Sequence, residues 1–291
     1  IAMVGGKSTV ADEYRELTGG AKKLTATEIT ETGTRVQKIV VDNASSIAPA
    51  LTARTGKSAQ EVESLIQAGT ARLKTQPKVE KEVHKITAQL TNADKPEEAA
   101  LIYAAIGNYK GKGEKLLPLL NKVKTETDMK SLYNITNNKN MTFIVGKTTD
   151  KELSIVMNRM RKNNGEPIFD EFGPGRVEHF IEGDRNGNYA SGFHHQGLSE
   201  KGNAVAPGAA NKQGIRESGV MIDGVKKSIY YGKSTLFPED WGIIKTLDAV
   251  SEAYHSPGRI PHPSKPNVFL GTSNGITIEM VIKNNIIITA Y

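Results

Sequence analysis

Helix-like spacing of apolar positions marks the first part of the chain. Ser58–Glu61 is a capping box, in which a serine and a glutamate satisfy the free backbone groups at the start of a helix. Behind it, apolar residues recur at near-helical intervals at Val62, Leu65, Ile66 and Leu73. The pattern predicts an amphipathic helix that begins after Ser58.

A second helix is predicted from about Val79. The apolar residues on its inner face are Val83, Ile86 and Leu90. His84 lies on the same helix among charged neighbours. We interpret His84 as a solvated residue without a functional role.

A third helix is expected to open at Asp94 and Pro96, because a capping residue followed by proline in the first turn is typical of helix starts. Its apolar residues are Leu101, Ile102 and Ile106. This half of the sequence carries no motif with catalytic chemistry. We interpret residues 1–135 as a helical module.

The pattern changes between Leu132 and Asp150. Four asparagines indicate a loop there, namely Asn134, Asn137, Asn138 and Asn140. Short apolar runs then predict strands over residues 177–181, 189–194, 219–222 and 228–231. Pro238 is expected to open a helix whose inner face carries Trp241, Ile244, Leu247, Val250 and Tyr254.

Closing strands are predicted at Phe269 and over residues 276–281 and 286–290, with Asn284 and Asn285 as the turn between the last two. Strands with few helices between them are typical of an α+β domain. The fold class is therefore α+β: a helical module, followed over residues 136–291 by a domain of antiparallel sheets with packed helices.

Composition limits the number of domains and excludes some classes of protein and site. The 291 residues suffice for two ordinary domains, and the absence of cysteine excludes disulfides and thiolate metal ligands. No apolar window is long enough for a transmembrane helix, so no stable membrane insertion is expected. The chain starts at Ile1 without a signal segment, and we interpret it as a piece of a longer polypeptide.

The net charge of +6 favours polyanionic partners, although a merely soluble basic protein fits it equally well.

Two histidine segments, Glu178-His179-Phe180 and Gly192-Phe193-His194-His195, flank Asn186-Gly187, a pair that signals a tight β-hairpin. A hairpin folds the segment back on itself, so His179 and His194 can meet on one surface. Two facing imidazoles can act as a general base and a general acid near neutral pH. In a basic protein, such a pair suggests cleavage of RNA through its own 2′-hydroxyl.

Four segments resemble those of the EndoU-type endoribonucleases and occur in the family's order. They are Glu178–Asp184, Gly192–His194, Lys233–Trp241, which is similar to the Ser-Thr-Phe-Phe-Pro-x-x-Trp stretch of bacterial members, and Ile288–Tyr291, which resembles a closing Thr-x-Tyr. The similarity covers roughly residues 140–291. It implies an EndoU-like nuclease domain that needs no metal or other cofactor.

The resemblance assigns the proton transfers to His179 and His194, and by analogy His194 is the base and His179 the acid. Adjacent side chains on a strand point to opposite faces, so only one of His194 and His195 should line the groove. The histidine that follows Gly-Phe matches the motif, which favours His194. His195 stays a candidate for a substrate contact, and all three histidines could instead be hydrogen-bonded surface residues.

The resemblance also implies a lysine that stabilises the charge of the phosphorane. Its expected position, a few residues before the Ser-Thr segment, holds Tyr230. Lys227 lies three residues earlier and Lys233 three later. Either could reach the site if the hairpin is longer or bulged, because a lysine side chain is long and flexible.

Four further residues are candidates for substrate binding. Ser234 or Thr235 could bond a base edge, or could cap the helix expected near Pro238. Thr289 and Tyr291 could orient the ribose and stack on a base. Tyr291 could equally be an aromatic residue of the core.

Bacterial members of this family are often the C-terminal parts of polymorphic toxins, including contact-dependent growth inhibition effectors, in which a helical module aids entry. The resemblance therefore implies a monomeric toxin, secreted or displayed on the cell surface within a larger effector, that cleaves RNA, with tRNA favoured, in the target-cell cytoplasm. A cognate immunity protein is the expected partner. Two alternatives remain: a metal-dependent DNase that uses His194 and His195, and a nonenzymatic basic RNA-binding module.

Overall fold

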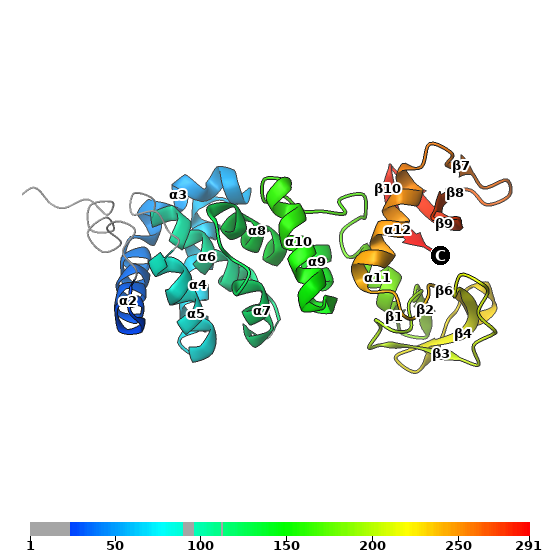
Figure 1. Ribbon diagram of the computed structural model, residues 1–291, viewed down its shortest axis with the longest axis horizontal. Coiled ribbons are helices and arrows are strands. Elements are labelled where there is room, and N and C mark those ends of the chain that lie inside the picture. The colour runs from blue at the N-terminus through cyan, green and yellow to red at the C-terminus, as the bar shows by residue number, and fades with distance from the viewer. Residues whose placement is uncertain (1–23, 90–95, 112) are drawn as a thin grey trace, which may run out of the picture. The chain divides into compact units, whose positions relative to one another are not determined.

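The structure is a computed structural model that describes residues 24–89, 96–111 and 113–291. These residues form two compact units (Figure 1). The first contains the described residues up to Asn138 together with Ser154–Pro167, and the second contains Lys139–Leu153 and Ile168–Tyr291. Two residues of the expected helix boundaries, Leu90 and Asp94, lie outside the described residues.

The first unit is helical throughout its described part. Its elements are α2 (Ala26–Asp42), α3 (Ala44–Thr55), α4 (Ala59–Leu73), α5 (Pro77–Gln89), α6 (Pro96–Asn108), η1 (Gly113–Leu116), α7 (Leu117–Leu120) and α8 (Glu126–Asn137), and α10 (Asp150–Lys162) ends in it. The predicted capping box of α4 is confirmed, because Ser58 Oγ accepts from the Glu61 amide and Glu61 Oε2 accepts from the Ser58 amide at 2.8 Å.

Helix α6 is the centre of the first unit and is buried on all sides from Glu98 to Ile106. It packs against α4 and α8. Two glycines allow the α4 contact, because a Cβ on Gly69 would lie 1.9 Å from the Tyr103 carbonyl oxygen and one on Gly107 would lie 2.1 Å from that of Leu65. The backbones of the two helices therefore touch.

The expectation that His84 is solvated is wrong. Its side chain is buried where α5 packs against α2, and its Nε2 lies 2.6 Å from Gln37 Oε1. Burial lowers the pKa of His84. The charged residues around it in sequence lie on the other faces of α5, so a helix with a polar average can still bury one polar residue.

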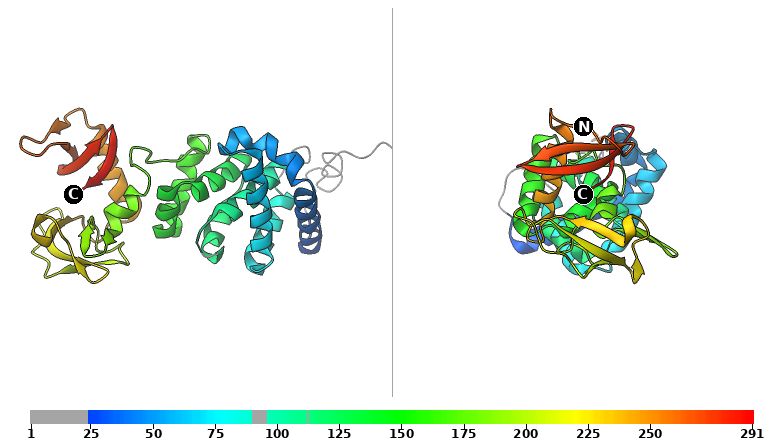
Figure 2. Two further views of the ribbon diagram at one scale, coloured as in Figure 1. Left: turned by 180° about the vertical axis from the view of Figure 1, so that it is seen from behind. Right: turned by 90° about the vertical axis from the view of Figure 1, so that its right-hand side faces the viewer.

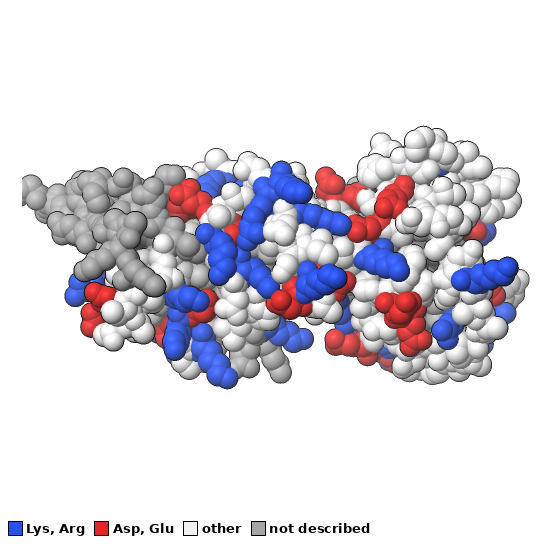
Figure 3. Space-filling model, viewed as in Figure 1, with Lys and Arg blue, Asp and Glu red and all other residues white. Residues whose placement is uncertain are grey.

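On the face drawn in Figure 3, Lys and Arg side chains are spread over both units rather than gathered at one place. The positive net charge therefore does not locate a site by itself.

None of the helices in the described ranges is both long enough and apolar enough to cross a membrane.

The second unit combines three helices with two four-stranded sheets and a small hairpin. The helices are α9 (Lys139–Lys147), α11 (Arg176–Glu182) and α12 (Ile243–His255). The strands are β1 (Asp184–Asn186), β2 (Tyr189–Ser191), β3 (Gly202–Val205), β4 (Arg216–Ile222), β5 (Val225–Lys226), β6 (Lys233–Leu236), β7 (Ile260–Pro261), β8 (Val268–Ser273), β9 (Ile276–Lys283) and β10 (Ile286–Ala290). The predicted α+β class is confirmed.

All pairs within the sheets are antiparallel. One sheet has the order β10-β9-β8-β7 and is covered by α12, which packs on β8 and β9. In the other sheet β4 pairs with β3, β5 and β6. Figures 1 and 2 show Tyr291 at the chain end between these two sheets.

Three of the predicted strands differ in the structure. Residues 177–181 form helix α11 instead of a strand, because Val177, Phe180 and Ile181 have the i, i+3, i+4 spacing of a buried helix face. The second strand ends at Ser191, since Gly192 (φ 78°) and Phe193 (φ 63°) turn the chain away. Residues 228–231 lead into a 3-10 turn, η2 (Tyr230–Gly232), instead of a strand.

The C-terminal predictions hold more closely. The hairpin turn at Asn284 and Asn285 is confirmed, with φ values of 51° and 58° that asparagine tolerates. The helix expected from Pro238 begins only at Ile243, so Trp241 precedes it. Pro238 lies in the loop before α12 instead of in its first turn.

Candidate active site

His179 lies in the last turn of α11, and the residues after that turn fix its ring. Gly183 ends the helix with φ 76°, which glycine adopts without strain. The chain then folds back so that Asp184 Oδ2, at the start of β1, lies 2.7 Å from His179 Nδ1. Because a carboxylate accepts hydrogen bonds, Nδ1 carries the proton of this bond and Nε2 is left for a substrate.

His194 lies in the loop behind β2 and is held by backbone bonds. Its amide donates to the Phe180 carbonyl at 2.9 Å, and its carbonyl accepts from the Phe237 amide at 2.9 Å. The ring Nδ1 lies 2.9 Å from the Thr235 carbonyl oxygen. A carbonyl oxygen only accepts, so Nδ1 is protonated and Nε2 is the basic nitrogen of the neutral ring.

The backbones of the two histidine segments approach each other closely. A Cβ on Gly192 would lie 2.2 Å from the His179 carbonyl oxygen, so this position requires glycine. The next residue, Phe193, is fully buried in a core cluster with Ala190, Val220, Ile222 and Leu236. Gly192 therefore permits the approach, and Phe193 anchors the loop that carries His194.

The surroundings of His194 disfavour its charged form. Burial lowers its pKa to about 3, the nearby charges of Lys227 and His179 act in the same direction, and the Thr235 carbonyl opposes them. The ring is thus neutral across the physiological pH range, as a proton acceptor must be before reaction.

Lys227 is the lysine that the structure brings to these rings. Its Nζ is 2.5 Å from Ser234 Oγ, which in turn donates to the Gly192 carbonyl at 3.3 Å. The side chain is 4% exposed, and burial lowers its pKa to about 8. Lys227 reaches this place because residues 227–232 form an extra turn between β5 and β6, and both of these strands pair with β4. Lys233 is exposed at the start of β6.

The two histidines and Lys227 line one cavity of about 690 Å³, a size typical of ligand sites. Walls come from α11, the β1–β2 hairpin, β6, β9 and β10. The charged residues of the lining are mostly basic: Arg176, Lys227, Lys233, Lys265 and Lys283, against Glu217 and Glu279. Such a lining favours an anionic ligand.

The other predicted residues from the chain's closing segment also line this cavity. The Tyr291 ring stacks on the His194 ring with centroids 5.5 Å apart and an interplanar angle of 20°. Tyr291 is held there by two backbone bonds to Glu279 of 2.8 and 2.9 Å. The Thr289 hydroxyl is buried and has no hydrogen-bond partner among the described residues. Thr289 is thus part of the cavity lining, but its hydroxyl oxygen is covered by protein atoms in this structure.

Two predicted substrate residues are placed differently. His195 is fully buried and is not part of the cavity lining, and burial lowers its pKa to about 4. Ser234 lines the cavity, but its hydroxyl bonds Lys227 and a carbonyl, so it orients the lysine. Neither Ser234 nor Thr235 caps α12, whose N-cap is Gly242.

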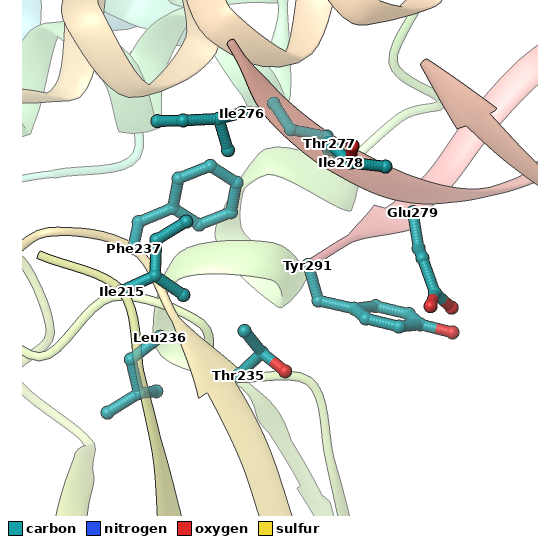
Figure 4. A pocket seen from close by; sticks show the side chains of 9 residues that line it. All are labelled: Ile215, Thr235, Leu236, Phe237, Ile276, Thr277, Ile278, Glu279 and Tyr291. Atoms are coloured by element: carbon teal, nitrogen blue, oxygen red, sulfur yellow. The ribbon is translucent and has the colours of Figure 1, made fainter. Parts of the chain in front are cut away.

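A smaller cavity of about 220 Å³ lies beside the first and shares Thr235, Glu279 and Tyr291 with it (Figure 4). Its remaining lining is mostly apolar: Ile215, Leu236, Phe237, Ile276, Thr277 and Ile278. In Figure 4, the ring of Phe237 points toward Ile276, away from the Tyr291 ring. The cavity extends the site with an apolar compartment.

Comparison with protein families adds a direct finding. Residues 175–291 match the model of the family described as bacterial EndoU nuclease. This part of the chain is similar to the bacterial EndoU nucleases. The predicted resemblance is confirmed, and all the residues placed above around the larger cavity lie within this EndoU region, residues 175–291.

A curated protein of Bacillus cereus, named "Toxin", is 32% identical over 121 residues. The match covers 40% of this chain and 22% of that protein. The chain thus spans about a fifth of the length of the relative that it matches. No solved structure matches the chain.

Asp184 lies in the first EndoU motif, but the motif by itself did not indicate that its carboxylate would bond His179. The signal was available, because a glycine at 183 ends the helix and lets the next residue turn back to His179. Glu182 was missed as well: this buried carboxylate accepts from Ser199 Oγ and from the amides of Glu200 and Lys201, and it pairs with Lys147 at 2.6 Å. It fastens the end of α11 to the chain that follows His195.

Proposed function

We propose that the EndoU region is a metal-independent endoribonuclease. In this reaction the 2′-hydroxyl of RNA attacks the adjacent phosphorus and expels the 5′-oxygen, which leaves a 2′,3′-cyclic phosphate and a 5′-hydroxyl. The observation that carries the proposal is the placement of His179, His194 and Lys227 in one basic cavity. These side chains supply a base, an acid and a cation, which is all that the reaction requires.

His194 suits the role of the base. Its Nδ1 proton is committed to the Thr235 carbonyl, so Nε2 takes the proton of the 2′-hydroxyl. The isolated ring is a weak base because of burial and nearby positive charge. A bound phosphate adds negative charge to the cavity, which raises the basicity of the ring when the substrate is present.

His179 suits the role of the acid. The Asp184 carboxylate accepts from Nδ1 and so aims Nε2 at the cavity, where the protonated ring offers a proton to the leaving 5′-oxygen. Lys227 stabilises the charge that gathers on the phosphorane oxygens. Because its pKa is lowered only to about 8, most Lys227 side chains are protonated and positively charged at pH 7.

A substrate with one 2′-deoxyribose tests the mechanism. We expect RNA with an intact 2′-hydroxyl to be cut and the same strand with 2′-deoxyribose at the scissile position to stay whole, because the nucleophile is missing. The products are identified by mass spectrometry as a cyclic phosphate and a 5′-hydroxyl. His179→Ala serves as the inactive control, and His255→Ala, an exposed histidine on α12, as the matched active one.

Chelation separates this proposal from a metal-dependent DNase. Among the described residues no three His, Asp or Glu side chains are grouped so that they could hold a metal ion. We expect cleavage of RNA to survive EDTA and duplex DNA to be left intact. Loss of activity in EDTA that returns with a divalent cation would contradict the proposal. A nonenzymatic RNA-binding module would cut neither substrate.

We further propose that the chain is the toxic end of a larger effector. Residues 136–291 act as the ribonuclease, with tRNA as the favoured target, and residues 1–135 act as an entry module. The support is the relative named "Toxin" and the separate helical unit. The effector is secreted or displayed on the producing cell, acts in the target-cell cytoplasm, and is blocked by a cognate immunity protein.

Sequencing of total RNA after brief induction of the chain in bacteria tests the target. We expect new 5′-hydroxyl ends concentrated in tRNA, and none with His194→Ala. Ends spread over all RNA classes would refute tRNA preference and leave the nuclease proposal intact.

A further inference from the structure

Three exposed apolar side chains stand at the rim of the catalytic cavity. Tyr189 is 50% exposed, Ile229 is 36% exposed and Tyr231 is 99% exposed, and all three belong to the cavity lining. Scattered exposed apolar residues need no explanation, but a group at the mouth of a basic cavity does. We call these three residues the aromatic shelf.

The shelf is built by two segments that lie side by side. The Ser228 amide donates to the Ala190 carbonyl at 2.9 Å, and the Ala190 amide donates to Ser228 Oγ at 2.9 Å. These bonds join the strand that carries Tyr189 to the turn that carries Ile229 and Tyr231. Hydrogen bonds between the two backbone segments therefore support the shelf. Along the chain, the segment of Tyr189 leads into the loop of His194, and the segment of Ile229 and Tyr231 follows Lys227.

The backbone of Tyr231 has an unfavourable conformation for a residue other than glycine. Its φ of 56° and ψ of 25° lie in the left-handed region, which is costly for a residue with a Cβ. A ring that is 99% exposed contributes no burial to the fold in return. Backbone strain without a gain in packing is typical of residues that contact a ligand.

We propose that the aromatic shelf stacks an unpaired nucleobase of single-stranded RNA, next to the nucleotide that is cut. The inference rests on the proposed ribonuclease function and extends it to a neighbouring nucleotide. Aromatic rings bind bases of any sequence by stacking when basic groups follow the backbone, and Arg176 and Lys233 line the same cavity. Tyr291 already covers His194, so the shelf receives a different base.

Alternating aromatic and basic groups favour nucleic acid over a protein partner, whose docking surface would not need a basic cavity behind it. The shelf therefore selects substrates that are unpaired beside the cleavage site. This restricts cleavage to loops and single-stranded ends of folded RNA.

Short oligonucleotides with one abasic site test the shelf. Two strands are made, with the abasic residue directly 5′ or directly 3′ of the cleaved bond, because the shelf could receive the base on either side. For one of these two strands, we expect the kcat/KM of the wild-type chain to be about tenfold lower than for the intact strand. The loss should appear mainly in KM. Tyr231→Ala should cut this strand and the intact strand at the reduced level, whereas Tyr231→Trp should retain the difference.

Ile260→Ala is the matched control, because Ile260 is an exposed apolar residue outside the cavity lining. Thermal unfolding should be unchanged in all three variants. If the wild-type chain cuts abasic and intact strands equally, or if Tyr231→Ala keeps the full difference, the shelf does not bind a base. If the wild-type chain cuts no RNA at all, the ribonuclease proposal itself fails. RNA binding is then measured without cleavage, by fluorescence anisotropy of labelled RNA. Comparison of His179→Ala with the double variant His179→Ala, Tyr231→Ala shows whether Tyr231 contributes to binding.

Discussion

The two units both bury polar side chains, but they use them differently. In the helical unit, Asp128 is fully buried and all its bonds are internal: Arg161 Nε lies 2.6 Å from Oδ1, and the amides of Lys124 and Thr125 donate to Oδ2. In the EndoU region, His179, His194 and Lys227 surround a cavity of about 690 Å³. A polar group with all its bonds made inside the fold stabilises it, whereas one that faces a cavity keeps bonding capacity for a ligand.

This difference is visible in two buried histidines. His84 bonds Gln37 in the helical unit, and His194 bonds a carbonyl but keeps Nε2 for the cavity. Burial lowers the pKa of both rings, so the pKa alone does not separate a histidine that supports the fold from one that lines the cavity. The two histidines differ in their surroundings: His84 bonds a buried glutamine, whereas His194 lines the cavity and its Nε2 is not used by the bond to Thr235.

The largest expected effect is the loss of either of the two imidazole rings proposed as base and acid. His194→Ala and His179→Ala should each lower the rate of RNA cleavage by about 10³-fold, because a positioned base or acid is lost. The rate is measured on a short oligonucleotide under single-turnover conditions. His255→Ala should cut at the wild-type rate, and a His179 or His194 variant that keeps a tenth of that rate would break the assignment.

Lys227→Met should have opposite effects on activity and stability. The rate should fall by about 10²-fold, because the cation near the phosphorane is lost. The free energy of unfolding at pH 7 should rise by about 1–2 kcal/mol, since an apolar side chain replaces a buried charge. Urea unfolding of the wild-type and Lys227→Met proteins measures the change in free energy. The control is Lys233→Met, at an exposed site, which should have smaller effects on both the cleavage rate and the free energy of unfolding. A less stable Lys227→Met protein would show that the ammonium supports the fold.

The pH dependence follows from the same lysine. Its pKa is about 8 in the folded chain and 10.5 without perturbation, so the unfolded chain binds the extra proton between these values. Stability should therefore rise from about pH 8 to 10.5, and cleavage should fall about tenfold per pH unit above pH 8 as the ammonium is lost. Lys227→Arg should move the alkaline decline in activity upward. An unshifted decline would assign it to another group.

Asp184→Asn should have a smaller effect, on the order of tenfold on the rate, because the carboxylate is more than half exposed and water screens its charge. The rate is measured on the same short oligonucleotide under single-turnover conditions. Asp223→Asn, in the turn between β4 and β5, is the matched control. Equal cleavage rates for both variants would remove Asp184 from the mechanism.

The smallest effect on cleavage is expected in the helical unit. His84→Ala should lower the free energy of unfolding by about 1–3 kcal/mol, since Gln37 is left buried without its partner. The rate of RNA cleavage by the folded protein should stay unchanged. Denaturation and cleavage are measured on the same preparation. A folded His84→Ala protein that cuts poorly would show that the two units do not act independently.

Local patterns predicted the parts of this fold that local physics determines. The capping box at Ser58 and the turn at Asn284 are formed by neighbouring residues, and both are confirmed. The segment around Val177 was assigned to the wrong element, because a run of five apolar and polar residues satisfies a strand and a short helix alike. Only the packing of the Phe180 ring against Phe172, His194 and Phe237 decides between the two.

The site was predictable in its residue types but not in its contacts. His179 and His194 followed from the motifs, whereas the choice between Lys227 and Lys233 depended on an extra turn between β5 and β6 that no sequence pattern marks. The bond from Ser234 to Lys227 depends on the same turn. Burial of His195 depends on the turn at Gly192 and Phe193, which ends the strand before the two histidines.

Gly192 fits against the His179 carbonyl oxygen with no room for a further carbon. Alanine there would force the two imidazole-bearing segments apart, and proton transfer is sensitive to such separations. A single substitution that adds one methyl group at this position could therefore remove the proposed activity and leave each reacting side chain intact. Inspection of the reactive residues alone would score such an allele as active.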